Sequence, residues 1–255
     1  MMKTGSGLGR KRRKVRLFEA RREKKIGQPP GTPVHVGAVR DFQPWASFVH
    51  YSSTAYGETA IIVPEQIRAS LKPDQVNWIN VEGVHDVPFI QVVSNQFDLH
   101  PLTQEDIVNT SHRPQFESYA GYFFFAMKML YTSPEGHLVQ EHISLVLQGN
   151  TVITFQETPG DVFGRIRDRI RSQTGKIRAR GADYLLYLLL DSIVDGYYQV
   201  VDRLGERIDT IEEELRCGPS DPQLARIFEM RREILLLRKN IIPVRDLLNK
   251  VQVEG

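Results

Sequence analysis

Carboxylate side chains recur at helical spacing between positions 191 and 213. They lie four and seven residues apart, which places them along one face of a helix. The row consists of Asp191, Asp195, Asp202 and Asp209, flanked by Glu206 and Glu213. Like charges four residues apart repel each other by about 0.2–0.5 kcal/mol per pair. Carboxylates that retain water suit Mg²⁺ or Ca²⁺, and no EF-hand loop favours calcium. The row is therefore either a hydrated acidic face or a surface that binds divalent cations.

Motifs of catalysis are absent from the sequence. It has no Gly-x-Ser-x-Gly turn, no His-Glu-x-x-His pair and no Walker loop, and its seven histidines are scattered. We interpret these histidines as turn, strand or surface residues. The single cysteine, Cys217, has no histidine near it in the sequence and cannot form an internal disulfide or a cysteine-rich zinc site. The sequence therefore predicts that the protein is not an enzyme.

The acidic row belongs to the first of two long helices that we predict for residues 181–255. Apolar residues alternate at three- and four-residue spacing from Leu185 to Leu215, which is typical of a helix with one buried face. Such a helix has roughly 36 residues and is about 54 Å long. Cys217-Gly218-Pro219 should end it. The spacing and this break predict two antiparallel helices joined by a short turn.

The second long helix has a clear start and no clear end. Ser220 and Gln223 have the spacing of a capping box, which marks the first turn. Pro243 lies inside the helix and should bend it. The apolar pattern reaches Val251 without a proline stop or a basic last turn. We therefore expect this helix to continue beyond the given residues.

The first two thirds of the chain alternate between strand and helix patterns. Predicted strands cover residues 34–36, 47–51, 60–63, 76–81, 121–131, 137–148 and 150–156, the last two joined by a tight Gly-Asn hairpin. Predicted helices cover residues 64–71, 86–97, a short segment after 101, and 160–171. This order predicts an α/β fold, an αβα layer sandwich with a mixed sheet, over residues 29–180.

The net charge of +2 hides an asymmetry along the chain. Residues 1–25 contain 11 Lys and Arg against 2 Glu, so the rest of the chain is acidic. We interpret residues 1–28 as a disordered, solvated basic tail; the alternative is an arm that binds nucleic acid. No nucleic acid is expected, because Phe18 is the only aromatic residue beside the basic ones. No apolar run is long enough to span a membrane.

Several motifs are spread over residues 26–255. They are Gly27-Gln28-Pro29-Pro30-Gly31-Thr32, Trp78-Ile79-Asn80-Val81, His100-Pro101-Leu102-Thr103-Gln104-Glu105-Asp106-Ile107, His112-Arg113-Pro114, Phe155-Gln156-Glu157, Gly160-Asp161-Val162-Phe163 and Ala182-Asp183-Tyr184-Leu185-Leu186-Tyr187. In this order and without large gaps, they resemble the cytosolic N-terminal region of the CorA family of magnesium and cobalt ion channels. Each motif alone is weak, but the set is specific. Only the basic tail lies outside the resemblance.

The resemblance implies how the chain is assembled and where it works. In the family, an αβα sandwich is followed by a helical hairpin, whose acidic tip corresponds to Glu212, Glu213 and Glu214, and by a stalk helix that leads into the membrane. We therefore expect the second helix of residues 181–255 to be a truncated stalk. In the family, five identical subunits form a funnel at the cytoplasmic face of the cell membrane, so the resemblance implies a homopentamer. The given residues lack both membrane helices and the Gly-Met-Asn pore signature of the family.

The resemblance also implies a metal site. In the family, Mg²⁺ bound between neighbouring cytosolic domains holds the pore closed, and Co²⁺ is a second ion. Glu105 and Asp106 match positions at that site, and Asp191 matches another nearby carboxylate. Asp195 is added on helical spacing alone. The usual partner aspartate on the stalk would lie beyond the given residues, so only half of each site is expected here.

Three alternatives stay open at this point. A zinc transporter of the same superfamily is the nearest, although the sequence does not supply the His and Cys ligands that zinc favours. A nucleic-acid-binding protein could use the basic tail, in which case its binding would depend steeply on salt. A stand-alone α/β domain could use the acidic helices only to dock a partner.

Overall fold

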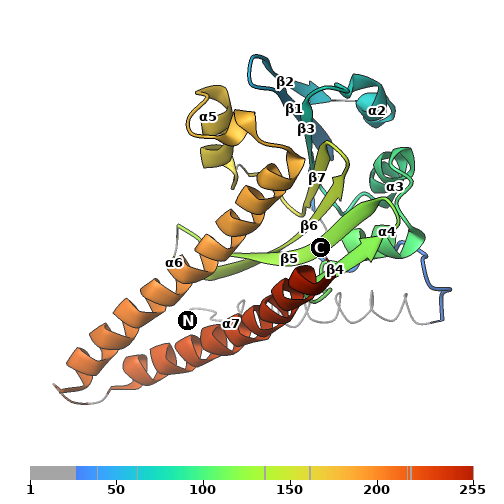
Figure 1. Cartoon of the computed structure of the whole chain (residues 1–255). Coiled ribbons are helices and arrows are strands. Elements are labelled where there is room, and N and C mark those ends of the chain that lie inside the picture. The colour runs from blue at the N-terminus through green and yellow to red at the C-terminus, as the bar shows by residue number, and fades with distance from the viewer. Residues whose placement is uncertain are drawn as a thin grey trace, which may run out of the picture.

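A mixed β-sheet forms the centre of the molecule (Figure 1). The computed structural model describes residues 27–38, 40–61, 63–134, 136–160, 162–216, 218 and 220–254. The tail predicted for residues 1–28, apart from its last two residues, lies outside this part, as do Cys217 and Pro219. The strands are β1 (Trp45–Tyr51), β2 (Tyr56–Ile61), β3 (Val76–Glu82), β4 (Gln115–Tyr119), β5 (Tyr122–Thr132), β6 (Leu138–Gln148) and β7 (Thr151–Gln156).

Helices follow and flank these strands. They are the 3₁₀-helices η1 (Pro64–Gln66) and η2 (Ile177–Ala179), and the α-helices α2 (Ile67–Ser70), α3 (Val87–Gln96), α4 (Pro101–Val108), α5 (Gly164–Arg171), α6 (Ala182–Arg216) and α7 (Asp221–Glu254). Local signals explain several of their starts. Asp86 caps α3 by accepting a hydrogen bond from the Phe89 N–H, and Pro101 occupies the first turn of α4.

The sheet has the strand order β2-β1-β3-β7-β6-β5-β4. Only β3 and β7 are parallel, and every other neighbouring pair is antiparallel. The predicted hairpin at Gly149-Asn150 joins β6 to β7, and Gly149 has a φ of 56°, which glycine adopts readily. The prediction of a mixed sheet is confirmed.

Helices cover both faces of this sheet (Figure 1). One apolar layer joins Ile79 and Phe124 of the sheet to Ile90 of α3 and Ile107 of α4. Because side chains alternate along a strand, neighbouring positions such as Trp78 face the opposite layer, which packs against α5 and α6. The predicted αβα sandwich is confirmed.

Some element predictions were wrong in detail. Residues 34–36 form no strand, and Val36 makes only an isolated bridge to Asn109. The helix predicted for 160–171 begins at Gly164, and residues 64–71 divide into η1 and α2. Strand β4 was missed. Its five residues, Gln-Phe-Glu-Ser-Tyr, are too few and too polar to predict a strand without their partner β5.

The predicted long helices form a hairpin whose arms separate toward the sheet (Figure 1). Helix α6 has 35 residues and lies across β5, where Gly196 approaches the backbone carbonyl of Leu130. Helix α7 has 34 residues and passes the β4 edge, where the Lys250 ammonium donates a hydrogen bond to the Phe116 carbonyl at 3.0 Å. It continues through Pro243. The Ser220 N–H donates to Gln223 Oε1 at 2.8 Å, as the capping box predicts.

Candidate metal-binding carboxylates

Helix α4 carries the predicted pair Glu105 and Asp106. This helix packs on the same face of the sheet as α3. The segment that enters the domain passes beside it. There the Gly31 N–H donates a hydrogen bond to Glu105 Oε2 at 2.7 Å. A Cβ atom at position 31 would lie 2.8 Å from Pro101 Cβ, and its φ of +81° also favours glycine. The glycine therefore allows the entering segment to contact α4 and to orient Glu105.

Asp106 is largely enclosed, with 17% of its side chain exposed. Its Oδ2 accepts a hydrogen bond from Gln115 Nε2 at 2.8 Å, and its Oδ1 lies 3.3 Å from His112 Nε2. Burial raises the pKa of Asp106, whereas His112 and Gln115 lower it, and burial dominates. The fold therefore positions this carboxylate at some electrostatic cost.

A buried polar cluster lies beneath the backbone of α4. His142 Nε2 is 3.2 Å from the Asp106 carbonyl oxygen, and the Lys128 ammonium is 3.3 Å from His142 Nδ1. Lys128 also donates to the carbonyl of Thr110 at 2.6 Å. Burial lowers the pKa of Lys128 to about 8 and the pKa of His142 well below its usual value. Two strands of the sheet therefore fix the position of the α4 backbone at Asp106.

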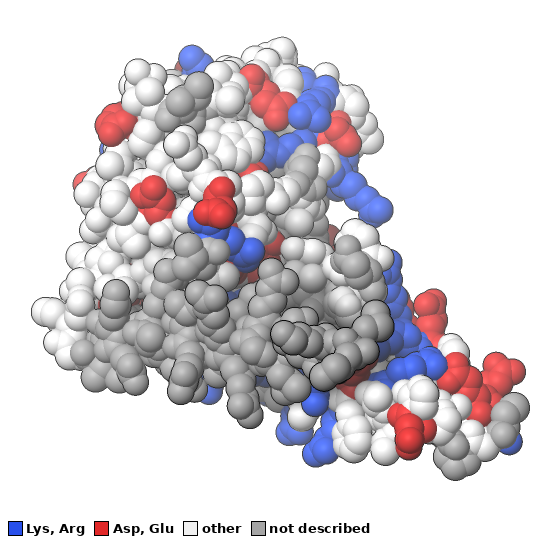
Figure 2. Space-filling view, turned by 180° about the vertical axis from the view of Figure 1, so that it is seen from behind, with Lys and Arg blue, Asp and Glu red and all other residues white. Residues whose placement is uncertain are grey.

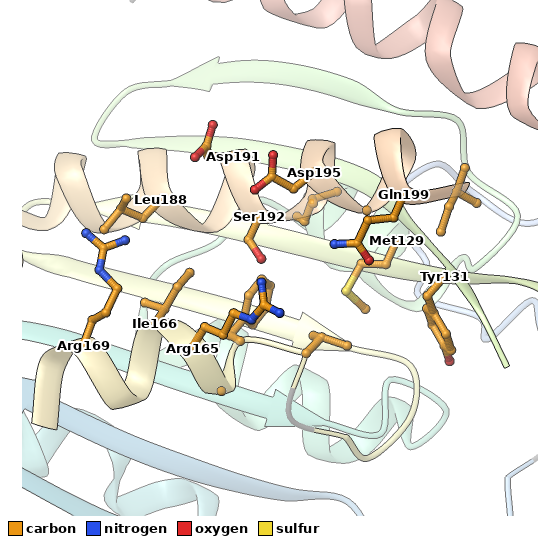
Figure 3. A pocket seen from close by; sticks show the side chains of 16 residues that line it. Met129, Tyr131, Arg165, Ile166, Arg169, Leu188, Asp191, Ser192, Asp195 and Gln199 are labelled. Atoms are coloured by element: carbon orange, nitrogen blue, oxygen red, sulfur yellow. The ribbon is translucent and has the colours of Figure 1, made fainter. Parts of the chain in front are cut away.

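The second predicted pair, Asp191 and Asp195, lies on α6 and is exposed. Both residues line the rim of a cavity of about 450 Å³ between α5 and α6. Figure 3 shows their carboxylates on the side of α6 away from Arg165 and Arg169. Neither carboxylate makes a hydrogen bond or ion pair with another of the described residues, so the two remain open to solvent.

The sheet separates the two pairs within one chain. Helix α4 packs on the layer with α3, whereas α6 packs on the opposite layer with α5. Within the described residues, no group of three or more His, Cys, Asp or Glu side chains is placed to hold one metal ion. The oxygen donors suit Mg²⁺, but a coordination sphere with more than one pair would need carboxylates from a second chain.

The hairpin tip is acidic, and one of its three predicted carboxylates is neutralised. Glu212 and Glu213 are exposed, whereas both carboxylate oxygens of Glu214 lie 2.7–2.8 Å from Arg226 Nη1 of α7. Figure 2 shows acidic side chains gathered at this end, with Lys and Arg further along the hairpin. Glu214 therefore links α6 to α7 and is less available to an external cation than its two neighbours.

Sequence reasoning missed two residues that hold Asp106. Gln115 and His112 follow it by nine and six residues, in β4 and in the preceding turn, and no helical or strand spacing relates them to α4. His112 does belong to the motif His112-Arg113-Pro114, which was the only signal available. Their contact with Asp106 arises because the chain reverses after α4.

Comparisons with known proteins agree with this architecture. The family model described as CorA-like Mg²⁺ transporter protein matches residues 73–254. The cobalt/magnesium transport protein CorA of Thermotoga maritima is 37% identical over 237 residues, which cover 92% of this chain and 67% of that protein. A putative metal ion transporter of Bacillus subtilis, YfjQ, is 27% identical over 76% of this chain and 61% of its own length. These relatives are named as transport proteins and not as enzymes.

Solved structures with low sequence identity show the same fold. The soluble domain of CorA from Methanocaldococcus jannaschii aligns with a TM-score of 0.62 at 17% identity, covering 79% of this chain and 77% of that one. The cytoplasmic domain of ZntB from Vibrio parahaemolyticus aligns with a TM-score of 0.54 at 16% identity, covering 80% and 78%.

The matches leave part of the relatives uncovered. The chain spans about two thirds of the length of the Thermotoga maritima protein and less of the other curated relatives it matches. Within the described residues, no helix combines the length and the apolar composition that crossing a bilayer requires. The family model nevertheless covers most of the sequence, including the sheet strand β3 and both long helices. The chain belongs to the CorA family.

Proposed function

We propose that the chain is the Mg²⁺-sensing part of a CorA-type channel for magnesium and cobalt ions, at the cytoplasmic face of the cell membrane. The observation that carries the proposal is the separation of the two carboxylate pairs. Glu105 and Asp106 lie on one side of the sheet, and Asp191 and Asp195 lie on the other. In a ring of identical subunits, opposite sides of neighbouring domains face each other, so one subunit's α4 pair can approach another subunit's α6 pair.

Electrostatic repulsion between the carboxylates would make the stability of such an interface depend on Mg²⁺. Two carboxylates 4 Å apart repel by about 1 kcal/mol in water and by several-fold more where water is partly excluded. A shared Mg²⁺ turns this repulsion into attraction. Mg²⁺ retains much of its water and is held by few carboxylates, so its binding should be weak enough to follow the cytosolic concentration. When the ion leaves, the subunits separate and the pore opens.

An apolar stripe on α7 supports assembly into a homopentamer. Four of its residues recur every seven positions and stay 36–45% exposed: Ile227, Ile234, Ile241 and Leu248. This spacing is typical of a helix that packs against another helix. The stripe supports the expectation that α7 contacts further helices in the assembled channel. Two statements stay predictions. One is that α7 is the beginning of the stalk, and the other is that residues 29–180 and 181–255 are separate units.

The donor set favours Mg²⁺ over zinc. The candidate ligands are carboxylate oxygens on exposed or half-buried helical positions, and carboxylate with water is the coordination that Mg²⁺ prefers. Zinc favours histidine nitrogen and cysteine sulfur. The fold likeness to a ZntB domain does not alter this preference, because it concerns the backbone arrangement.

Sedimentation of the full chain with and without millimolar Mg²⁺ tests the proposal. We expect Mg²⁺ to shift the chain from small to larger species and to protect α4 from protease. Asp106→Ala and Asp191→Ala should each abolish both effects. Asp209→Ala is the matched control, because Asp209 is an exposed carboxylate of α6 outside the candidate site. A response that persists in Asp106→Ala, or no response in the unmodified chain, would refute the sensor role.

A further inference from the structure

The cavity between α5 and α6 has features that metal sensing does not use. Its volume of about 450 Å³ lies within the range of pockets that bind small organic molecules. Two arginines of α5, Arg165 and Arg169, form one wall. Ser192 and Gln199 of α6 add polar groups on the opposite wall (Figure 3). The cavity is therefore lined by hydrogen-bond donors from two helices.

The arginines of α5 form two pairs with the same spacing and different surroundings. Arg167 and Arg171 both contact Glu58, at 3.6 Å and 2.8 Å, on the side of the helix that faces β2. Arg165 and Arg169 make no ion pair with any described residue, and the nearest acid on the helix, Asp168, is paired with Arg171 at 3.1 Å. One pair is thus neutralised within the fold, while the other presents positive charge to the cavity.

The cavity also has apolar walls that are not fully covered. Met129 and Leu188 form part of its buried lining. Val162 remains 41% exposed and Tyr131 37% exposed, although both line the same cavity. Exposed apolar side chains beside unpaired cations suit a ligand with an anionic end and a flat, weakly polar body. Inorganic phosphate would occupy only a small part of this volume.

The acidic residues on the rim do not oppose such a ligand directly. Figure 3 shows the carboxylates of Asp191 and Asp195 directed away from Arg165 and Arg169, whereas the Ser192 side chain points toward Arg165. The two arginines therefore lie on the opposite wall of the cavity from these two carboxylates.

We propose that this cavity binds a phosphate-bearing organic anion of the nucleotide class. Arg165 and Arg169 would hold the phosphates through charge-assisted hydrogen bonds, which a guanidinium makes in pairs. The ring of Tyr131 and the apolar lining would contact the base. The proposed contacts to the ligand use none of the candidate metal ligands, although Asp191 and Asp195 lie on the rim of the same cavity.

Calorimetric titration of the full chain with ATP in EDTA tests the site without Mg²⁺. Replacing both arginines, Arg165→Ala with Arg169→Ala, should weaken ATP binding at least tenfold. Arg180→Ala is the matched control, because it removes a positive charge from an exposed position of the same basic stretch outside the cavity. We expect less than a twofold effect from it. Unchanged melting temperatures would exclude loss of the fold.

Tripolyphosphate and Tyr131→Ala separate nucleotide recognition from attraction to charge. ATP should bind more tightly than tripolyphosphate, and Tyr131→Ala should weaken ATP binding while leaving tripolyphosphate unchanged. Absence of ATP binding, equal affinity for the two ligands, or equal effects of the double variant and Arg180→Ala would each overturn the proposal. Binding through the basic residues 1–25 would survive the double substitution and would also count against it.

Discussion

The carboxylates of α4 and α6 are held in contrasting ways. Asp106 of α4 is 17% exposed and has Gln115 and His112 as partners, and its backbone is fixed by a buried cluster. Asp191 and Asp195 of α6 are exposed, and no described residue contacts their carboxylates through a hydrogen bond or ion pair. The Asp106 carboxylate is held in place and partly dehydrated, whereas the two carboxylates of α6 are open to water.

The difference shows that the electrostatic cost of burying a carboxylate falls on α4 and not on α6. Burial raises the pKa of Asp106, so the folded state bears an electrostatic penalty that a bound cation would relieve. Asp195 carries no comparable enclosure, so its removal should scarcely affect the fold. A divalent ion bound by carboxylates of both helices would be positioned by the fixed carboxylate of α4 and attracted by the exposed carboxylates of α6.

Among the substitutions considered, shortening a buried side chain of α6 should have the largest effect on the free energy of unfolding. Leu189 is fully buried against the sheet, two and six positions from the exposed aspartates. Leu189→Ala should lower the free energy of unfolding by about 2–5 kcal/mol, measured by denaturant titration. Tyr187→Ala, at a position 56% exposed on the same helix, should change it far less. Equal losses in both variants would mean that α6 is not anchored by its buried face.

Two glycines of α6 should respond oppositely to replacement by alanine, because only one of them packs closely against the sheet. A Cβ at Gly196 would lie 2.9 Å from the Leu130 carbonyl oxygen, so Gly196→Ala should force α6 away from β5 and destabilise by about 1–3 kcal/mol. At Gly205 nothing lies within 4 Å of the added atom, and Gly205→Ala should stabilise by up to about 1 kcal/mol. Opposite signs in thermal melts are the expected result; matching signs would contradict the close approach.

The pH dependence of stability should distinguish Asp106 from its exposed counterparts. Because its pKa is higher in the folded than in the unfolded state, the folded protein binds the proton more tightly. Stability from this group is therefore fully present below the unfolded pKa and is lost as pH rises through the folded pKa. Asp106→Asn should remove that loss. In metal-free buffer, the free energy of unfolding of this variant should therefore exceed that of the unmodified chain by an amount that grows from about pH 4 upward. A difference independent of pH would argue against the burial effect.

Substitution of the exposed carboxylates should have the smallest effect on stability. Asp195→Asn relieves repulsion from Asp191 four residues away, so we expect a stabilisation of about 0.5 kcal/mol or less. Its effect should decrease with added salt, because the charges are screened. Denaturant titrations at low and high salt provide the measurement, and a loss of several kcal/mol would reveal a structural role that the fold does not suggest.

Local sequence signals were sufficient for much of the fold. Helical periodicity predicted α6 and the hairpin with α7, and the Gly149-Asn150 pair predicted the β6–β7 turn. These signals act between residues close in sequence, so they survive without tertiary information. Strand β4 escaped prediction because its identity depends on pairing with β5 and not on its own short pattern.

Sequence patterns were sufficient to predict the αβα class, the two long helices, the family resemblance and the positions of the candidate carboxylates along the chain. Which of these carboxylates are enclosed depends on tertiary contacts, because Gln115 and His112 reach Asp106 only where β4 returns beside α4. Tertiary structure likewise decided that Arg165 and Arg169 face an open cavity while their equally spaced neighbours meet Glu58. Helical spacing fixes which side chains share a face, but burial and charge depend on what packs against that face, and those partners come from distant parts of the chain.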